Sequence, residues 1–166
     1  MHPSAWIESQ QEELVRTVVR WSNRNTGSAN VAGLQSFSDE LIAEFAELRP
    51  DRVEKREVTS PAGPSIPLLV FQKRTEASRR VFLFGHLDTV FGPDHPFQRA
   101  TVPGDGRILG PGVCDMKGGL AVLLCGLRAF EGFIEEKRLG WTVVINSDEE
   151  VGSPASSASL VEEARG

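Results

Sequence analysis

Apolar residues recur with two different periods along this chain, and their alternation constrains the fold more than any other feature of the sequence. Residues 81–87 (VFLFGHL) and 141–147 (WTVVINS) are nearly continuous in apolar side chains, as expected for strands that are covered on both faces. Residues 116–136, which lie between them, carry apolar side chains around much of a helical circumference, and this predicts a buried helix. Strands and helices that alternate in this way are typical of an α/β sheet with helices on its faces.

Weaker patterns outside this unit predict further helices and strands. Pro50 ends the second helical pattern, because proline disfavours the helical conformation in the residue before it. The predicted elements are helices at 4–24 and 31–48, strands at 53–59 and 67–73, and a last helix at 154–164. We therefore predict the α/β fold class, with a mixed, largely parallel twisted sheet flanked by helices.

The charge balance argues against a nucleic-acid partner. The chain has 18 Lys and Arg residues against 23 Asp and Glu residues, a net charge of −5, whereas nucleic-acid binders carry basic patches. No apolar run approaches the roughly 20 residues that span a bilayer, so we expect no membrane partner. The two cysteines cannot form a disulfide framework, and we expect a reducing, cytoplasmic location.

The cysteines and tryptophans have structural interpretations. We predict that Cys114 and Cys125 are both small buried apolar residues. Trp6, Trp21 and Trp141 are predicted to be packing residues rather than a platform for a substrate.

Ionisable residues follow the two most strand-like runs, where the chemistry of open α/β sheets collects. The first run ends with His86 and Asp88, and the second is followed by Asp148, Glu149 and Glu150. Between them, Asp115 stands at the start of the buried helix.

Each of these groups also has a purely structural interpretation. His86 could be an ordinary histidine at a strand end, and Asp88 could begin a turn. Asp115 could cap the following helix, since an aspartate accepts hydrogen bonds from the first free amides. The acidic residues 148–150 could form a solvated loop.

Taken together, the same residues suit a metal site. His86 and Asp88 are two apart on a strand and point the same way, so the acid can hold the ring of a metal-bound histidine. Glu149 and Glu150, on an extended segment, would point to opposite sides and could perform different tasks. A carboxylate–imidazole mixture suits Zn²⁺, with Mn²⁺ or Co²⁺ possible, and Asp115 could bridge two ions about 3.5–4 Å apart.

Three stretches carry a family resemblance: GHLDTVF (85–91), GPGVCDMKGG (110–119) and SDEEVGS (147–153). In this order and spacing they resemble the co-catalytic zinc amidohydrolases and metallopeptidases that include glutamate carboxypeptidase, acetylornithine deacetylase, succinyl-diaminopimelate desuccinylase and aminoacylase. The preceding helices and strands are similar to the N-terminal segment of that family, whose catalytic domain has a zinc-exopeptidase-like fold.

The resemblance implies a role for each site residue. His86 would bind one zinc ion and Glu150 the other, with Asp115 bridging both. Asp88 would orient His86, and Glu149 would be the general base that later protonates the leaving amine. The resemblance also implies a cis peptide bond between Asp115 and Met116, and glycines at 118 and 119 that bring the helix start close to the metals.

Members of that family are longer than this chain, and this shapes what we expect of it. Residues 1–166 would be the N-terminal portion of the catalytic metal-binding domain. The lid or dimerisation domain, the C-terminal catalytic segment, a further acidic ligand and a late histidine ligand would be absent, so metal affinity would be poor. The parent protein would be a homodimer through the missing domain, and a sheet left open at one edge would make the fragment self-associate.

The leading functional hypothesis is a two-zinc hydrolase of amide or peptide bonds next to a free carboxylate, resembling glutamate carboxypeptidase or the deacylases. Its substrate would be a small acyl-amino acid or a peptide, and this fragment would be inactive. The alternative is a non-catalytic, truncated α/β module that binds metal weakly or not at all. A Mg²⁺ phosphohydrolase fits less well, because the sequence offers no phosphate-binding glycine loop and histidine is a softer ligand than Mg²⁺ prefers.

Overall fold

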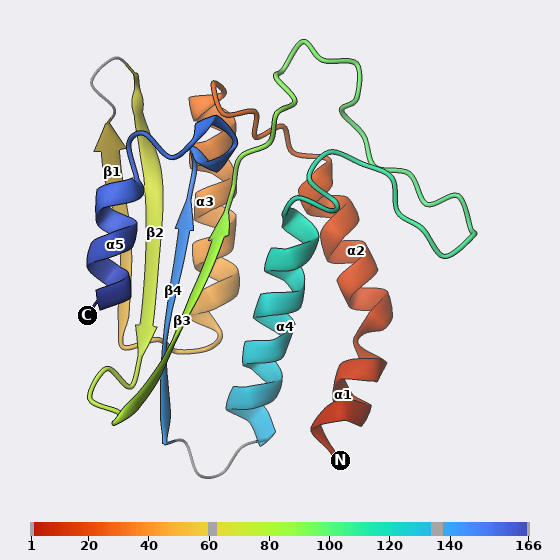
Figure 1. Ribbon diagram of the computed structural model, residues 1–166. Coiled ribbons are helices and arrows are strands. Elements are labelled where there is room, and N and C mark those ends of the chain that lie inside the picture. Colours follow the sequence, from red (N-terminus) through yellow and green to blue (C-terminus); the bar gives the residue numbers. More distant parts are fainter. Residues whose placement is uncertain (1, 60–62, 134–137, 166) are drawn as a thin grey trace.

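A single four-stranded sheet with helices on both faces forms the framework of the protein (Figure 1). The computed structural model describes residues 2–59, 63–133 and 138–165. Its elements are α1 (Pro3–Ser9), α2 (Gln11–Ser22), α3 (Val31–Ala46), β1 (Arg52–Thr59), β2 (Ser65–Lys73), β3 (Arg79–His86), α4 (Lys117–Phe133), β4 (Leu139–Asn146), the 3₁₀ turn η1 (Glu149–Val151) and α5 (Ser157–Arg165).

The predicted elements are all found, with two differences in the helices. The expected helix 4–24 is interrupted at Gln10, whose backbone N–H turns back to the carbonyl of Ile7 three residues earlier, at 3.0 Å. The long helix predicted for 116–136 is α4, and residues 134–136 of that prediction lie outside the described residues.

The strand order is β1-β2-β4-β3. β1 pairs with β2 and β2 with β4 in antiparallel register, and β3 pairs with β4 in parallel, from Arg79 opposite Leu139 to His86 opposite Asn146. The sheet is mixed, as predicted. It is not largely parallel over the described strands, because two of the three pairings, β1 with β2 and β2 with β4, are antiparallel.

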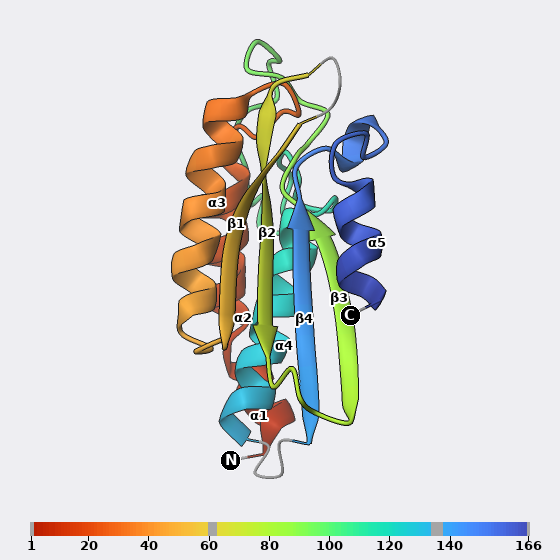
Figure 2. The ribbon, with the colours of Figure 1, turned by 90° about the vertical axis from the view of Figure 1, so that its left-hand side faces the viewer.

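Helices cover the two faces of the sheet unequally (Figure 2). α3 and α4 lie against one face, where the main core gathers Trp21, Phe37, Phe45, Phe71 and Val143. α5 lies on the opposite face, over a smaller buried cluster of Leu68, Val70 and Val144. None of the helices in the described ranges has the length and apolar character needed to cross a membrane.

The two most apolar strands differ in burial. β4 lies between β2 and β3 and is buried from Gly140 to its end, as predicted. β3 was expected to be covered on both faces, and this is wrong: Phe82 and Phe84 are 37% and 42% exposed. The reason is its position, since among the described strands β3 pairs only with β4 and lies at the edge of the sheet.

Glu131, near the end of α4, connects this helix to the sheet at the end of the strands opposite His86. Its side chain is 10% exposed and accepts hydrogen bonds or ion pairs from Arg74, Lys73 (3.0 Å) and the indole of Trp141 (3.0 Å). Burial opposes ionisation, but these donors outweigh it and lower the pKa of Glu131 to about 2. The carboxylate is therefore ionised throughout the range in which proteins are normally studied.

Replacing Glu131 with Gln is expected to lower the free energy of unfolding at pH 7 by about 1–3 kcal/mol, the usual value of hydrogen bonds to a charged group. The contribution of the carboxylate is present above its unfolded pKa near 4.5 and is lost as the pH falls toward 2. Urea denaturation of both proteins at pH 7 and pH 3 measures it, with Glu12→Gln, at a side chain 90% exposed, as control. An equal effect of Glu131→Gln at both pH values would contradict this account.

The exposed β3 edge predicts self-association of the isolated chain, because an unpaired strand with apolar side chains is a template for another strand. Replacing Phe82 and Phe84 together with Lys should lower the apparent mass at high concentration, measured by sedimentation equilibrium. Val102→Lys, at an exposed valine in the loop before α4, should leave the association unchanged. A monomeric parent chain at all concentrations would refute the prediction.

Candidate metal centre

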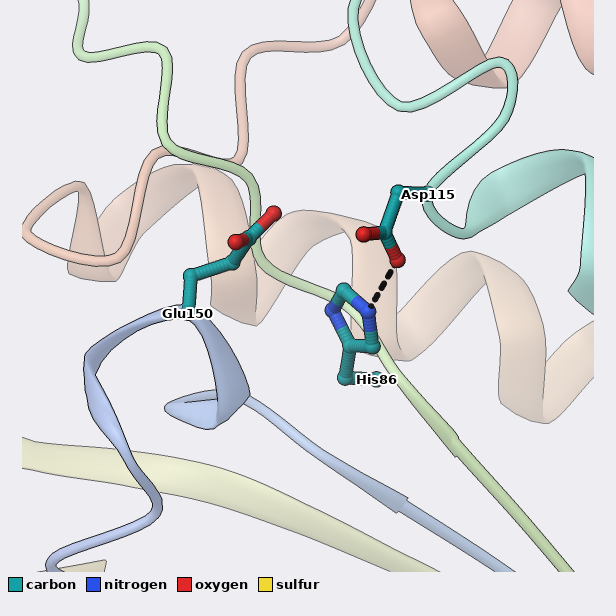
Figure 3. A group of neighbouring side chains, drawn as sticks. All are labelled: His86, Asp115 and Glu150. Atoms are coloured by element: carbon teal, nitrogen blue, oxygen red, sulfur yellow. Dashed lines mark hydrogen bonds and ion pairs between the residues drawn. The ribbon is translucent and has the colours of Figure 1, made fainter.

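Three segments that are distant in the sequence bring His86, Asp115 and Glu150 together (Figure 3). His86 ends β3, Glu150 lies in η1 directly after β4, and Asp115 precedes α4. One possible ligand atom from each lies within 4.8 Å of the other two. β3 and β4 are parallel, so the segments that follow them leave the sheet at the same end, where the carboxyl ends of both strands lie. The three side chains therefore converge on one place; their assignment as ligands stays a prediction.

The loop before α4 is built so that Asp115 faces His86. The Asp115–Met116 peptide bond is cis, as the resemblance implies, and the backbone N–H of Lys117 donates to the Gly112 carbonyl at 2.7 Å. Gly118 leaves no room for a Cβ atom because the carbonyl oxygen of Val113 occupies that place. The Asp115 carboxylate is 71% exposed and lies 2.8 Å from Nε2 of His86, so its partner is the imidazole.

His86 is held between two carboxylates. Its ring is 4% exposed, with Nδ1 3.2 Å from Oδ1 of Asp88 and 3.1 Å from the Asp88 carbonyl oxygen. Burial opposes a charged ring, but the hydrogen bonds to Asp88 and Asp115 outweigh it and raise the pKa of His86 to about 9. The imidazole of the metal-free chain is therefore protonated at neutral pH. The two carboxylates that stabilise this positive charge, Asp88 and Asp115, would also stabilise a metal cation next to the ring.

Asp88 is fully buried and organises the site from below. Besides His86, its carboxylate accepts a hydrogen bond from the Ser28 hydroxyl at 2.8 Å and from the backbone N–H groups of Glu149 and Glu150 at 3.2 Å each. Burial alone would raise the pKa of Asp88, but the hydrogen bonds from His86 and Ser28 and the charge of His86 hold it below its usual value. Asp88 does not simply begin a turn: one ionised group fixes both the imidazole and the η1 backbone.

Glu149 and Glu150 lie on a 3₁₀ turn, whereas the sequence analysis placed them on an extended segment. A 3₁₀ turn rotates successive side chains by about 120°, not 180°, so both carboxylates can approach the same region. Glu150 belongs to the convergent group, and Oε2 of Glu149 is 3.8 Å from Nε2 of His86. Partial burial and the nearby charges of Asp115, Asp88 and Glu149 raise the pKa of Glu150.

Asp148 is buried, which corrects the interpretation of residues 148–150 as a solvated loop. One oxygen accepts from the backbone N–H groups of Ala155 (2.7 Å) and Ser156 (3.2 Å). The other accepts from the Ser156 hydroxyl (2.5 Å) and the Asn146 amide (3.2 Å). Asp148 therefore fastens η1 to the end of β4 and to the residues that lead into α5.

Lys117 and Ser28 are two contributors that the sequence reasoning missed. The Lys117 side chain is fully buried, and its ammonium donates to the carbonyls of Trp21 (3.1 Å) and Arg24 (2.7 Å) and lies over the ring of Phe37. Burial lowers the pKa of Lys117 to about 7. A lone lysine in the apolar pattern of residues 116–136 was the available signal for Lys117; no periodicity singles out Ser28.

The structural interpretation of the remaining residues is correct except at one position. Cys125 is buried as predicted, but Cys114 is exposed, because it lies in the open turn just before Asp115. Trp21 and Trp141 are buried in the core, and Trp6 packs against Phe133 with ring centroids 5.8 Å apart. The tryptophans are therefore packing residues, as predicted.

The donor set fits a divalent cation. Zinc–ligand bonds of about 2.0–2.2 Å place two ligand atoms of one tetrahedral ion about 3.4 Å apart. Nε2 of His86 and Oδ1 of Asp115 are 2.8 Å apart, and one ligand atom from each of His86, Asp115 and Glu150 lies within 4.8 Å of the other two. An imidazole with its second nitrogen on Asp88 is the arrangement that metal-bound histidines adopt. The residues present therefore suit the ion that the resemblance implies.

Solved structures share the α/β fold of this chain. Human carnosine dipeptidase 1 matches with a TM-score of 0.82 at 20% identity, over 97% of this chain and 37% of that one. An M20 family metallo-carboxypeptidase from Sulfolobus solfataricus matches with a TM-score of 0.71 at 19% identity, over 92% of this chain and 35% of that one. Residues 82–166, half of the chain, match the model of peptidase family M20/M25/M40, and the chain belongs to this family.

Curated relatives agree with this placement. Carboxypeptidase G2 of Pseudomonas sp. is 29% identical over 160 residues, which cover 94% of this chain and 37% of that protein. The N-formyl-4-amino-5-aminomethyl-2-methylpyrimidine deformylase of Halalkalibacterium halodurans is 30% identical over 138 residues, which cover 78% and 31%. The chain thus spans about a third of the length of these relatives.

Asp148→Asn should destabilise the chain although it keeps the side-chain shape. Both oxygens of Asp148 accept from donors, so an amide NH₂ placed on either side faces an N–H or O–H group and leaves buried polar atoms unpaired. The expected loss is about 1–3 kcal/mol of unfolding free energy, measured by urea denaturation. Glu149→Gln, at a side chain 44% exposed, is the control and should change stability little; equal effects of the two variants would contradict this assignment.

Proposed function

We propose that this chain is the N-terminal portion of the catalytic domain of a metal-dependent hydrolase, which cleaves an amide or peptide bond next to a free carboxylate. The observation that carries the proposal is the convergence of His86, Asp115 and Glu150 within 4.8 Å, with the Glu149 carboxylate beside them. The family supports it, because its members among the similar proteins are a carboxypeptidase, a metallo-carboxypeptidase and a dipeptidase by name.

The metal would be zinc, two ions per complete site, with Co²⁺ or Mn²⁺ as possible substitutes. His86 would hold one ion and Glu150 the other, and the two oxygens of Asp115 would serve both. Bound there, the ions would supply Lewis-acid activation of water and of the scissile carbonyl. A further acidic ligand and a histidine would come from sequence outside these 166 residues, so this chain alone should bind metal weakly.

Glu149 is suited to general acid–base work. Its carboxylate is 44% exposed, so water and substrate can reach it, and its Oε2 lies 3.8 Å from the imidazole that would bind one ion. It would accept a proton from the attacking water at a carboxylate oxygen and return it to the leaving amine nitrogen. Asp88 would keep the imidazole in one orientation through its contact with Nδ1, so that Nε2 stays directed toward Asp115.

The complete enzyme would take a small acyl-amino acid or a peptide. A lid domain, which would recognise the free carboxylate of the substrate and form a homodimer contact, would belong to sequence outside this chain, as would the C-terminal catalytic segment. The dipeptidase and carboxypeptidase names of similar proteins favour a peptide as substrate, and the deformylase name favours an acyl-amine. We also propose a cytoplasmic location and deacylase-type activity as part of this hypothesis.

The second candidate is a non-catalytic α/β module that binds metal weakly or not at all. Within the described residues, His86, Asp115 and Glu150 are the one group of three potential ligands close enough to share an ion, and that number is small for two ions. Equilibrium dialysis of this chain with zinc tests the metal centre on which the first candidate depends. Zinc binding that is lost in His86→Ala supports the metal centre, and no binding up to millimolar zinc favours the module.

Glu149→Gln in the complete enzyme should lower kcat by about 10²–10⁴-fold, the usual contribution of a general base, because the amide cannot accept the proton. Bound zinc, measured by atomic emission, should remain at the parental stoichiometry, since Glu149 is not assigned as a ligand. Glu150→Gln is the paired variant and should lose metal as well as activity. A Glu149→Gln enzyme with parental kcat would refute the general-base role.

A further inference from the structure

A turn from the N-terminal half of the chain reaches the floor of the metal centre. Ser28 lies between α2 and α3, sixty residues before Asp88, and its hydroxyl donates to Oδ2 of Asp88 at 2.8 Å. Ser28 itself lies outside the three sequence motifs that define the site. The contact is made by a side chain that is only partly buried, in a segment otherwise rich in turn-forming residues.

The Ser28 backbone is fixed independently of its side chain. Ser28 N–H donates to the Thr89 carbonyl at 3.2 Å, and Thr89 N–H donates to the Thr26 carbonyl at 2.9 Å. Gly27 pairs with Thr89 as an isolated parallel bridge, and a Cβ atom at Gly27 would lie 2.6 Å from the carbonyl oxygen of Phe91. The turn is therefore anchored to the segment just after β3, and loss of the Ser28 hydroxyl alone leaves these backbone contacts in place.

The Asp88 carboxylate has four hydrogen-bonding partners around its two oxygens. Oδ1 accepts from Glu149 N–H and faces Nδ1 of His86, while Oδ2 accepts from Glu150 N–H and from the Ser28 hydroxyl. Without Ser28, Oδ2 would keep only a 3.2 Å bond from a backbone N–H in an exposed turn. Rotation of the carboxylate about its Cβ–Cγ bond would then move the acceptors away from the imidazole and η1 together.

We propose that Ser28 is a positioning residue of this centre. Its hydroxyl sets the rotation of the Asp88 carboxylate about the Cβ–Cγ bond, and this carboxylate holds the His86 ring and the Glu149–Glu150 backbone in place. The inference rests on the proposed function, because it assigns Ser28 to the same metal site. Ser28 acts through Asp88 and touches neither metal nor substrate. Direct partners of metal ligands, such as Asp88, typically change metal affinity by 10–100-fold when removed, and Ser28, one contact further from the ligand, is expected at the lower end of that range.

The chain offers a conservative variant and a matched control. Ser28→Thr keeps the hydroxyl, and the cavity of about 370 Å³ that Ser28 lines, with Ala29, Ile66 and Val151, has room for the added methyl group. Ser38→Ala removes another serine hydroxyl that donates, at 2.7 Å to the Gln35 carbonyl in α3, but has no contact with Asp88. Ser38→Ala therefore measures the general cost of such a deletion.

The test compares Ser28→Ala, Ser28→Thr, Ser38→Ala and the parent chain in two measurements. The first is amide hydrogen exchange of the metal-free proteins by NMR, in which Ser28→Ala should speed exchange at Glu149 and Glu150 relative to the strands. The second is zinc affinity by competition with a chromophoric chelator, in which Ser28→Ala should raise the dissociation constant about 10-fold, the lower end of the range for direct partners of ligands. Ser28→Thr should match the parent chain in both, and Ser38→Ala should leave both unchanged even if it lowers stability.

The two measurements test separate parts of the proposal. If Ser28→Ala exchanges at Glu149 and Glu150 as the parent chain does, the positioning role is overturned, whatever the zinc result. If exchange is faster but affinity equals that of Ser38→Ala, the role of Ser28 at the metal centre is likewise overturned. If the parent chain binds no zinc, the proposed metal centre of this chain fails, and the exchange data still decide whether Ser28 controls the η1 backbone.

Discussion

The ionised carboxylate of Asp88, sealed beneath the candidate metal centre, is the interaction on which the arrangement of this protein's site depends. A charge excluded from water is tolerated only when donors surround it, and those donors come from the α2–α3 turn, the end of β3 and the η1 turn. Satisfying this one charge therefore joins three segments that the chain would not otherwise bring together. The side chains above it, His86 and Glu150, take their positions from that junction.

The buried amine of Lys117 fixes the loop before α4. The ammonium of Lys117 is satisfied by the backbone carbonyls of Trp21 and Arg24, which lie at the end of α2 and just after it. Lys117 follows Asp115 by two residues, so this contact fixes the position from which Asp115 reaches toward His86. The site is thus positioned by two buried side chains, the carboxylate of Asp88 and the amine of Lys117, at the end of the sheet where β3 and β4 stop.

The sequence predicts most of the framework because the period of the apolar residues is a local property. The helices, the central strand β4 and the order of the three motifs follow from patterns within single segments, and the parallel pairing of β3 with β4 then places the motifs at one edge. The exposure of β3 and of Cys114 could not be predicted in this way, because it depends on which other segments of the chain pack against them and not on their own residue types. Ser28 is missed for the same reason: its partner lies sixty residues away, and the turn that carries it has no period. The 3₁₀ geometry at Glu149 and Glu150 is set by hydrogen bonds to Asp88 and Asp148, which no local pattern reveals.

Anomalous diffraction at the zinc absorption edge, from crystals of this chain grown with zinc, tests the central claim most directly. The account predicts an anomalous peak at this cluster, either between Nε2 of His86 and the Asp115 carboxylate or between the carboxylates of Asp115 and Glu150, with Asp88 still in contact with Nδ1 of His86. Zinc found only elsewhere on the chain, with these three side chains in contact only with one another or with water, would contradict it.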